Sequence, residues 1–183
     1  MTALQKHVFK NIILKVQVTI HPNWDRKAAT YDYALLKLKT PLDFSGAGSA
    51  VMPICLPTKN QEFDGKICTA SGWGLTKFGG KISKILKKVD LPIVPFEECK
   101  EDYEGLAKVD KNTMVCAGYE EGGRATCIGD SGGPLVCPRE DGRYVLAGST
   151  SFGAECAEPG YPPVFSRIST RLDWIKSIAR ETP

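Results

Sequence analysis

The stretch CIGDSGGPLVC, residues 127–137, places a serine among glycines and directly after an acid. A serine hydroxyl is a weak nucleophile at neutral pH, because it needs a base to accept its proton and donors to hold the oxyanion that forms. The glycines around Ser131 permit a tight turn that directs backbone N–H groups into a pocket. The stretch therefore makes Ser131 a candidate nucleophile.

The same letters also fit G-x-S-x-G, the nucleophile turn of the α/β-hydrolases. That fold requires the chain order Ser, then acid, then His. The two histidines of the chain, His7 and His21, both precede Ser131. The order of residues therefore excludes an α/β-hydrolase.

Length and composition set the class of protein. A chain of 183 residues with 42% hydrophobic and 25% charged residues is typical of one soluble globular domain. The net charge of +3 gives no basis for nucleic-acid binding, and the basic run at 81–88 is expected to be a solvated strand or loop.

No run approaches 18 apolar residues, so no membrane span is predicted. Lysines interrupt the first 20 residues, so we expect no signal peptide in this chain.

The seven cysteines are widely spaced and form no CxxC pair. This spacing favours disulfides in an oxidising compartment over a metal site. An odd number leaves at least one cysteine without a partner in the chain. We expect that the natural protein continues upstream of residue 1, which would explain both the odd count and the missing signal peptide.

Strict alternation of apolar and polar residues at 14–20 (LKVQVTI) is the period of a half-buried strand. Clusters of Gly and Pro separate this segment from several other short apolar runs, a pattern typical of an all-β sandwich or barrel. The pattern predicts helices at 96–103 and 169–180 and a connection between two halves at 53–60. The predicted strands are 14–20, 34–38, 67–71, 85–94, 134–137, 144–151 and 164–168.

Seven motifs, read in order, resemble the chymotrypsin-like (trypsin-fold) serine protease family. They are DYALLKL at 32–38, MPICLP at 52–57, SGWG at 71–74, MVCAG at 114–118, CIGDSGGPLVC at 127–137, SFG at 151–153 and PPVFSRIS at 162–169. The resemblance implies an all-β fold with two six-stranded antiparallel β-barrels, the first incomplete, and a C-terminal α-helix. Residues 1–57 would form the partial first barrel and the connection, 58–168 the second barrel, and 169–183 the helix. Nothing in the sequence indicates a calcium loop or another metal site, and no cofactor is expected.

The resemblance also implies roles for individual residues. Ser131 corresponds to the nucleophile, and Asp32 to the acid that orients the catalytic histidine. The N–H groups of Gly129 and Ser131 correspond to the oxyanion hole. Asp130 corresponds to the acid that receives the new N-terminal ammonium when a zymogen is activated. Ser151, Phe152 and Gly153 correspond to the strand that pairs with a peptide substrate, with Phe in place of the usual Trp.

The chain departs from the family at its front. The family's histidine stands farther from the acid than the 31 residues that precede Asp32, and neither His7 nor His21 lies in the corresponding motif. We expect both to be surface or turn residues. The family's activated N-terminus is also missing, so Asp130 would have no ammonium to pair with, and an unpaired buried carboxylate is costly.

By the same resemblance, Cys68 pairs with Cys137, Cys99 with Cys116, and Cys127 with Cys156. Cys55 is left over, and its partner in the family lies in the upstream segment. A free buried thiol at Cys55 is the alternative.

The resemblance places Ala125 at the floor of the specificity pocket, where trypsin-like members carry Asp. Burying a basic side chain there without a partner would be costly, so a preference for apolar substrate residues is expected. Gly153 would keep the pocket entrance open, Pro163 would reshape its base, and Ile128 would add an apolar lip.

Three hypotheses remain open from the sequence. The first is a secreted serine endopeptidase whose partners are polypeptide substrates or protein protease inhibitors, with this chain inactive alone because the histidine is missing. The second is a non-catalytic pseudoprotease that binds proteins. The third is an unstable fragment with no function of its own.

Overall fold

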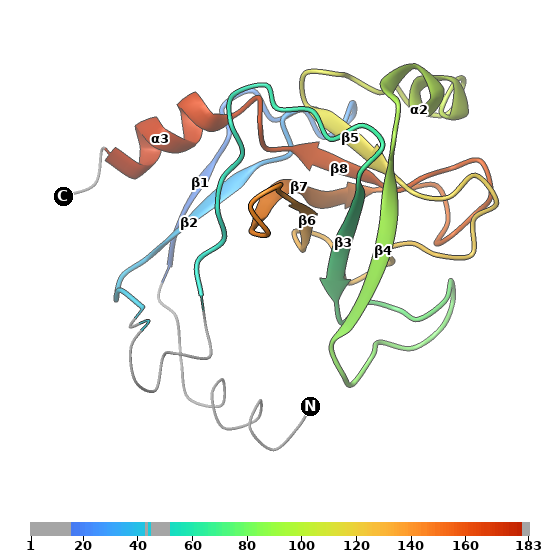
Figure 1. Ribbon diagram of the computed structural model, residues 1–183, viewed down its shortest axis with the longest axis horizontal. Helices are drawn as coiled ribbons and strands as arrows, with labels where there is room; N and C mark the ends of the chain where they lie inside the picture. The colour runs from blue at the N-terminus through green and yellow to red at the C-terminus, as the bar shows by residue number, and fades with distance from the viewer. Residues whose placement is uncertain (1–15, 43, 45–51, 181–183) are drawn as a thin grey trace.

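The computed structural model describes residues 16–42, 44 and 52–180 (Figure 1). Every predicted strand and helix is present; the strand at 34–38 has the predicted ends, the others have shifted ends, and one further strand, at 114–117, was not predicted. The elements are β1 (Val16–Ile20), β2 (Ala34–Leu38), β3 (Ile67–Gly72), β4 (Lys87–Val94), α2 (Phe96–Asp102), β5 (Met114–Ala117), β6 (Pro134–Pro138), β7 (Tyr144–Phe152), β8 (Val164–Arg167) and α3 (Leu172–Arg180).

Six strands close into a barrel in the order β3-β4-β5-β8-β7-β6, and every neighbouring pair is antiparallel. Alternate residues of these strands fill the interior, as the period of two requires. In β3, for example, Cys68 and Ala70 are buried while Ile67 is exposed. The barrel and the C-terminal helix confirm the mostly-β fold class. All six strands lie within 58–168, although the domain boundaries themselves stay a prediction.

The strands β1 and β2 form a separate two-stranded antiparallel sheet. Val18 lies opposite Leu36 in the register, and their side chains are 54% and 60% exposed. Ile20, on the same face as Val18, is 59% exposed. Figure 1 shows this sheet on the same side of the molecule as α3. One face of the sheet is therefore an uncovered apolar surface, which we call the open face (Val18, Ile20 and Leu36).

Hydrogen bonds at Asp32 and Tyr33, just before β2, hold the two-stranded sheet to the barrel. The Tyr33 hydroxyl lies between the carbonyl oxygens of Thr113, at 2.9 Å, and Arg167, at 2.8 Å, which share its single proton. The Ser166 hydroxyl donates to the backbone oxygen of Asp32 at 2.8 Å. Tyr33 also packs with Ile168 and Leu172, at the start of α3. The segment that carries Asp32 is thus fixed to β8.

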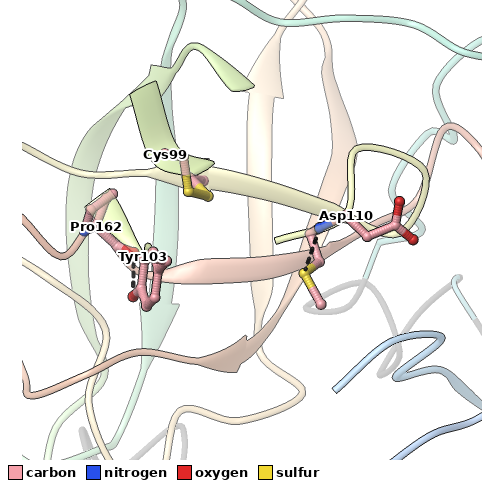
Figure 2. Close-up of a disulfide and its surroundings, with 6 residues drawn as sticks. Cys99, Tyr103, Asp110 and Pro162 are labelled. Atoms are coloured by element: carbon pink, nitrogen blue, oxygen red, sulfur yellow. Dashed lines mark hydrogen bonds between the residues drawn. A yellow bond between two sulfur atoms is a disulfide. The ribbon is translucent and has the colours of Figure 1, made fainter. Parts of the chain in front are cut away.

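The barrel carries three disulfides, Cys68–Cys137, Cys99–Cys116 and Cys127–Cys156, which are the pairs that the resemblance implies. Cys99–Cys116 ties α2 to β5 (Figure 2). In the same region the buried Tyr103 hydroxyl donates to the carbonyl oxygen of Pro162 at 2.9 Å. These contacts fix the segment 161–163 that leads into β8.

Two element ends differ from the predictions for local reasons. α3 begins at Leu172 rather than at 169, because a turn comes first: the Arg171 N–H donates to the Ile168 oxygen at 2.9 Å. β4 begins at Lys87 rather than at 85, because the Ser83 hydroxyl donates to the Ile85 oxygen and holds a bend there.

Candidate functional site

Ser131 lies exposed on the loop that leads into β6. Backbone hydrogen bonds shape this loop: the Asp130 N–H donates to the Cys127 oxygen at 2.9 Å, and the Gly133 N–H donates to the Asp130 oxygen at 2.8 Å. The Gly132 N–H donates to the Thr150 oxygen at 2.9 Å. The loop is therefore bonded to β7, and these hydrogen bonds fix the backbone on either side of Ser131.

The Asp130 carboxylate accepts two backbone hydrogen bonds, from the Gly74 N–H at 2.7 Å and from the Cys127 N–H at 2.9 Å. Gly72 and Gly74 of the SGWG motif make room for it, because a Cβ at either position would collide with the carboxylate. The Asp130 carboxylate, for which the sequence offers no N-terminal ammonium, therefore has these two amides as hydrogen-bond donors. Asp130 also lines a pocket of about 310 Å³ beside β3 and β4.

The backbone N–H groups of Gly129 and Ser131 have no acceptor among the described residues. Two such amides on one exposed turn can receive an anionic oxygen from a ligand.

Asp32, between the two strands of the small sheet, reaches the barrel through Ser151. The Ser151 hydroxyl, on β7, donates to Asp32 Oδ2 at 2.6 Å. Ser151 and Ser131 line the same pocket. The structure therefore brings the Asp32 carboxylate to the edge of the pocket that contains Ser131, although the two residues come from different sheets.

This pocket, which we call the serine pocket, has a volume of about 210 Å³. Its lining includes the predicted residues Ile128, Ser131, Ser151, Phe152, Gly153 and Pro163. Ala125 does not line it, but instead faces two neighbouring pockets. Sequence reasoning missed Phe78, Thr126 and Glu155, which do line the serine pocket.

The signals for two of the missed residues are visible in hindsight. Thr126 follows Ala125, and a one-residue shift would have found it. Phe78 precedes Gly79 and Gly80, a pair that marks a tight turn. Glu155 has no distinguishing local pattern.

His21 is buried in an aromatic cluster and does not contact the Asp32 carboxylate. Its ring lies 4.8 Å from the Tyr31 ring and 4.7 Å from the Trp174 ring, centroid to centroid. The Asn23 N–H donates to His21 Nδ1 at 3.2 Å. Burial, and then the positive charge of Arg171, lower the pKa of His21 below its ordinary value. His21 is thus a turn residue, as expected, but a buried one; His7 lies outside the described residues.

The disulfide Cys127–Cys156 connects two walls of the serine pocket. Cys55 carries a free, half-buried thiol. Its backbone lies beside β7, where the Leu146 N–H donates to the Cys55 oxygen at 2.9 Å.

Within the described ranges, no group of three or more His, Cys, Asp or Glu side chains could hold a metal ion. No helix in that part of the chain is long and apolar enough to cross a membrane.

Comparison with known proteins identifies a family model and similar curated proteins. The sequence model of the trypsin family matches residues 4–175. The chain is also similar to the protein named serine protease filzig of Drosophila melanogaster, with 38% identity over 176 residues. That match covers 95% of this chain but only 10% of the fly protein. The chain therefore spans about a tenth of the length of this curated relative.

Proposed function

Because this chain belongs to the trypsin family of serine proteases, we propose that it is an endopeptidase domain with Ser131 as the nucleophile and Asp32 as the acid that orients the catalytic imidazole. One observation carries the assignment. The Ser151 hydroxyl binds the Asp32 carboxylate at 2.6 Å, and Ser151 lines the same pocket as Ser131.

The chemistry follows from these positions. The Ser131 oxygen attacks the carbonyl carbon of the peptide bond while an imidazole accepts the hydroxyl proton. The N–H groups of Gly129 and Ser131 hold the oxyanion of the tetrahedral intermediate. The C–N bond then breaks, and the departing amine takes the proton from the imidazolium. Water repeats the sequence on the acyl-enzyme and releases the acid, while Asp32 holds the imidazole in its orientation.

The proposed specificity is for apolar substrate residues. Ile128, Phe152 and Pro163 supply apolar surface to the serine pocket. Ala125 has no charged group that could pair with a basic side chain of a substrate. Glu155 is the charged residue of the lining, and its side chain is exposed to water, which weakens its attraction for a cation.

The proposed partners are polypeptide substrates and protein protease inhibitors, and the proposed location is extracellular. Three disulfides support an oxidising compartment. The free Cys55 supports a disulfide to an upstream segment of the protein.

A non-catalytic protein-binding module is the second candidate. The observation in its favour is that, in the described part of the chain, no imidazole contacts the Asp32 carboxylate. Without the base, hydrolysis falls by about a million-fold, while a peptide can still occupy the pocket.

The test compares this 183-residue chain with the protein expressed from its complete transcript. We expect negligible hydrolysis of an apolar chromogenic peptide by the chain alone and protease-like turnover by the complete protein. Ser131→Ala should abolish that turnover, whereas Ser177→Ala, at an exposed position on α3, should not. Turnover that survives Ser131→Ala would refute the assignment. A complete protein that binds peptide but never cleaves it would support the second candidate.

A further inference from the structure

Phe78 lines the serine pocket, although it comes from a hairpin far upstream of Ser131. A tight turn presents it: the Gly80 N–H donates to the Lys77 oxygen at 2.9 Å, which places Phe78 and Gly79 at the two central positions. Gly79 has φ +67°, the left-handed value that favours glycine at the second central position. The turn formed by residues 77–80 therefore fixes the backbone that carries the Phe78 side chain.

The hairpin is tied to the loop that carries Ser131. Leu75 and Ile82 form an antiparallel bridge at its base, and the Thr76 N–H donates to the Lys81 oxygen at 3.4 Å. The Leu75 N–H donates to the Ile128 oxygen at 2.9 Å, next to Gly129. These contacts keep the Phe78 ring at the serine pocket.

Phe78 is 54% exposed, so more than half of its surface faces water. An apolar group in the pocket would cover that surface and remove it from water, which is favourable in proportion to the area covered. An aromatic group would gain further from ring–ring contact. A hydrated ammonium group would gain less from the same surface and would have to give up water.

We infer that Phe78 is a specificity-determining residue of this chain, and that it covers an aliphatic or aromatic side chain of a polypeptide bound in the serine pocket. This inference rests on the proposed function, because it takes the serine pocket as the substrate site.

The test measures equilibrium binding, which needs no catalytic base. The probes are three acetylated tetrapeptide amides that are identical except for a C-terminal Phe, Ala or Lys, titrated into the 183-residue chain by calorimetry. Phe78→Ala should weaken binding of the Phe peptide by about three- to tenfold and change binding of the Ala peptide by less than about twofold. Phe44→Ala is the matched control, since Phe44 is 49% exposed and lies outside the pocket lining.

A second variant separates this inference from the proposed function. A Cβ at Gly153 would meet Tyr103 and Pro163 at ordinary contact distances of 3.9 and 4.0 Å, so Gly153→Val should fold and obstruct the pocket. If Gly153→Val blocks all three peptides but Phe78→Ala changes none, the Phe78 inference alone is overturned. If Gly153→Val has no effect, or no peptide binds the parent chain, the pocket assignment fails and the inference fails with it. Tighter binding of the Lys peptide than of the Phe peptide would also overturn the inference.

Discussion

The single described histidine, His21, is buried among aromatic rings and lies near the positive Arg171, and both features disfavour its protonated form. Its pKa in the folded state is below the ordinary 6.5 that it regains on unfolding. The unfolded chain therefore binds the proton more tightly. The stability that depends on neutral His21 is fully present above about pH 6.5 and is lost as the pH falls below that value.

We predict that the free energy of unfolding falls between pH 7.5 and pH 5.5, as measured by urea titration. In His21→Phe, which keeps an aromatic ring but cannot be protonated, this fall should be smaller. His7→Phe, which removes the other imidazole of the chain, is the control and should keep the fall. An equal pH dependence in the parent chain and in His21→Phe would contradict the prediction.

Tyr103 is buried, and its hydroxyl is the donor to the Pro162 oxygen next to the pocket residue Pro163. Burial raises the pKa of Tyr103 to about 12, so this donor persists well into alkaline solution. Tyr103→Phe should lower the free energy of unfolding by about 1–2 kcal/mol, because a buried carbonyl loses its partner. Urea unfolding would measure this loss. Tyr144→Phe, at a 48% exposed position, should change it by less than about 0.5 kcal/mol.

At the scale of elements, the predictability of each strand depended on its pattern. The apolar run ALLKL was predicted over the same residues as β2, because a threonine–proline pair ends it. β5 is only four residues long, Met114–Ala117, and three of them are buried, so it shows no alternation. Such a short run cannot be told from a buried turn by its period.

The candidate site was predictable only where a motif carries it. CIGDSGGPLVC pointed to Ser131, and the family resemblance pointed to Asp32 and Ser151. The contact between Ser151 and Asp32 depends on how the small sheet docks on the barrel, which no local pattern encodes. The same is true of Phe78, whose role depends on the anchoring of a hairpin to a distant loop.

The docking of the β1–β2 sheet depends on Tyr33, whose hydroxyl serves two backbone acceptors. Tyr33→Phe should lower the free energy of unfolding by about 1–3 kcal/mol, because the two carbonyls lose the hydroxyl proton that they share. Amide hydrogen exchange in β1 and β2 should then be about tenfold faster or more, while exchange in the barrel strands stays nearly unchanged. Uniformly faster exchange across both sheets would show instead that Tyr33 supports the whole fold rather than the docking.

For the whole molecule, the open face is the main liability. Val18, Ile20 and Leu36 present apolar surface on a sheet of only two strands, and such surfaces promote association. Leu36→Glu should shift the purified chain toward the monomer in light scattering across a concentration series. Leu106→Glu is the matched control, because Leu106 is 59% exposed but lies outside the small sheet. An equal effect of both substitutions would point to net charge rather than to this face.

The hydrogen bond between Ser151 and Asp32 connects the six-stranded barrel with the segment that leads into the small β1–β2 sheet. Each of these two sheets has its own backbone hydrogen bonds. A ligand that touches both parts can bind only while they are docked, so it must stabilise the docked form by mass action. The coupling is reciprocal: whatever tightens the docking raises the affinity for such a ligand by the same factor. The affinity of such a ligand would then measure how stably the small sheet is docked on the barrel.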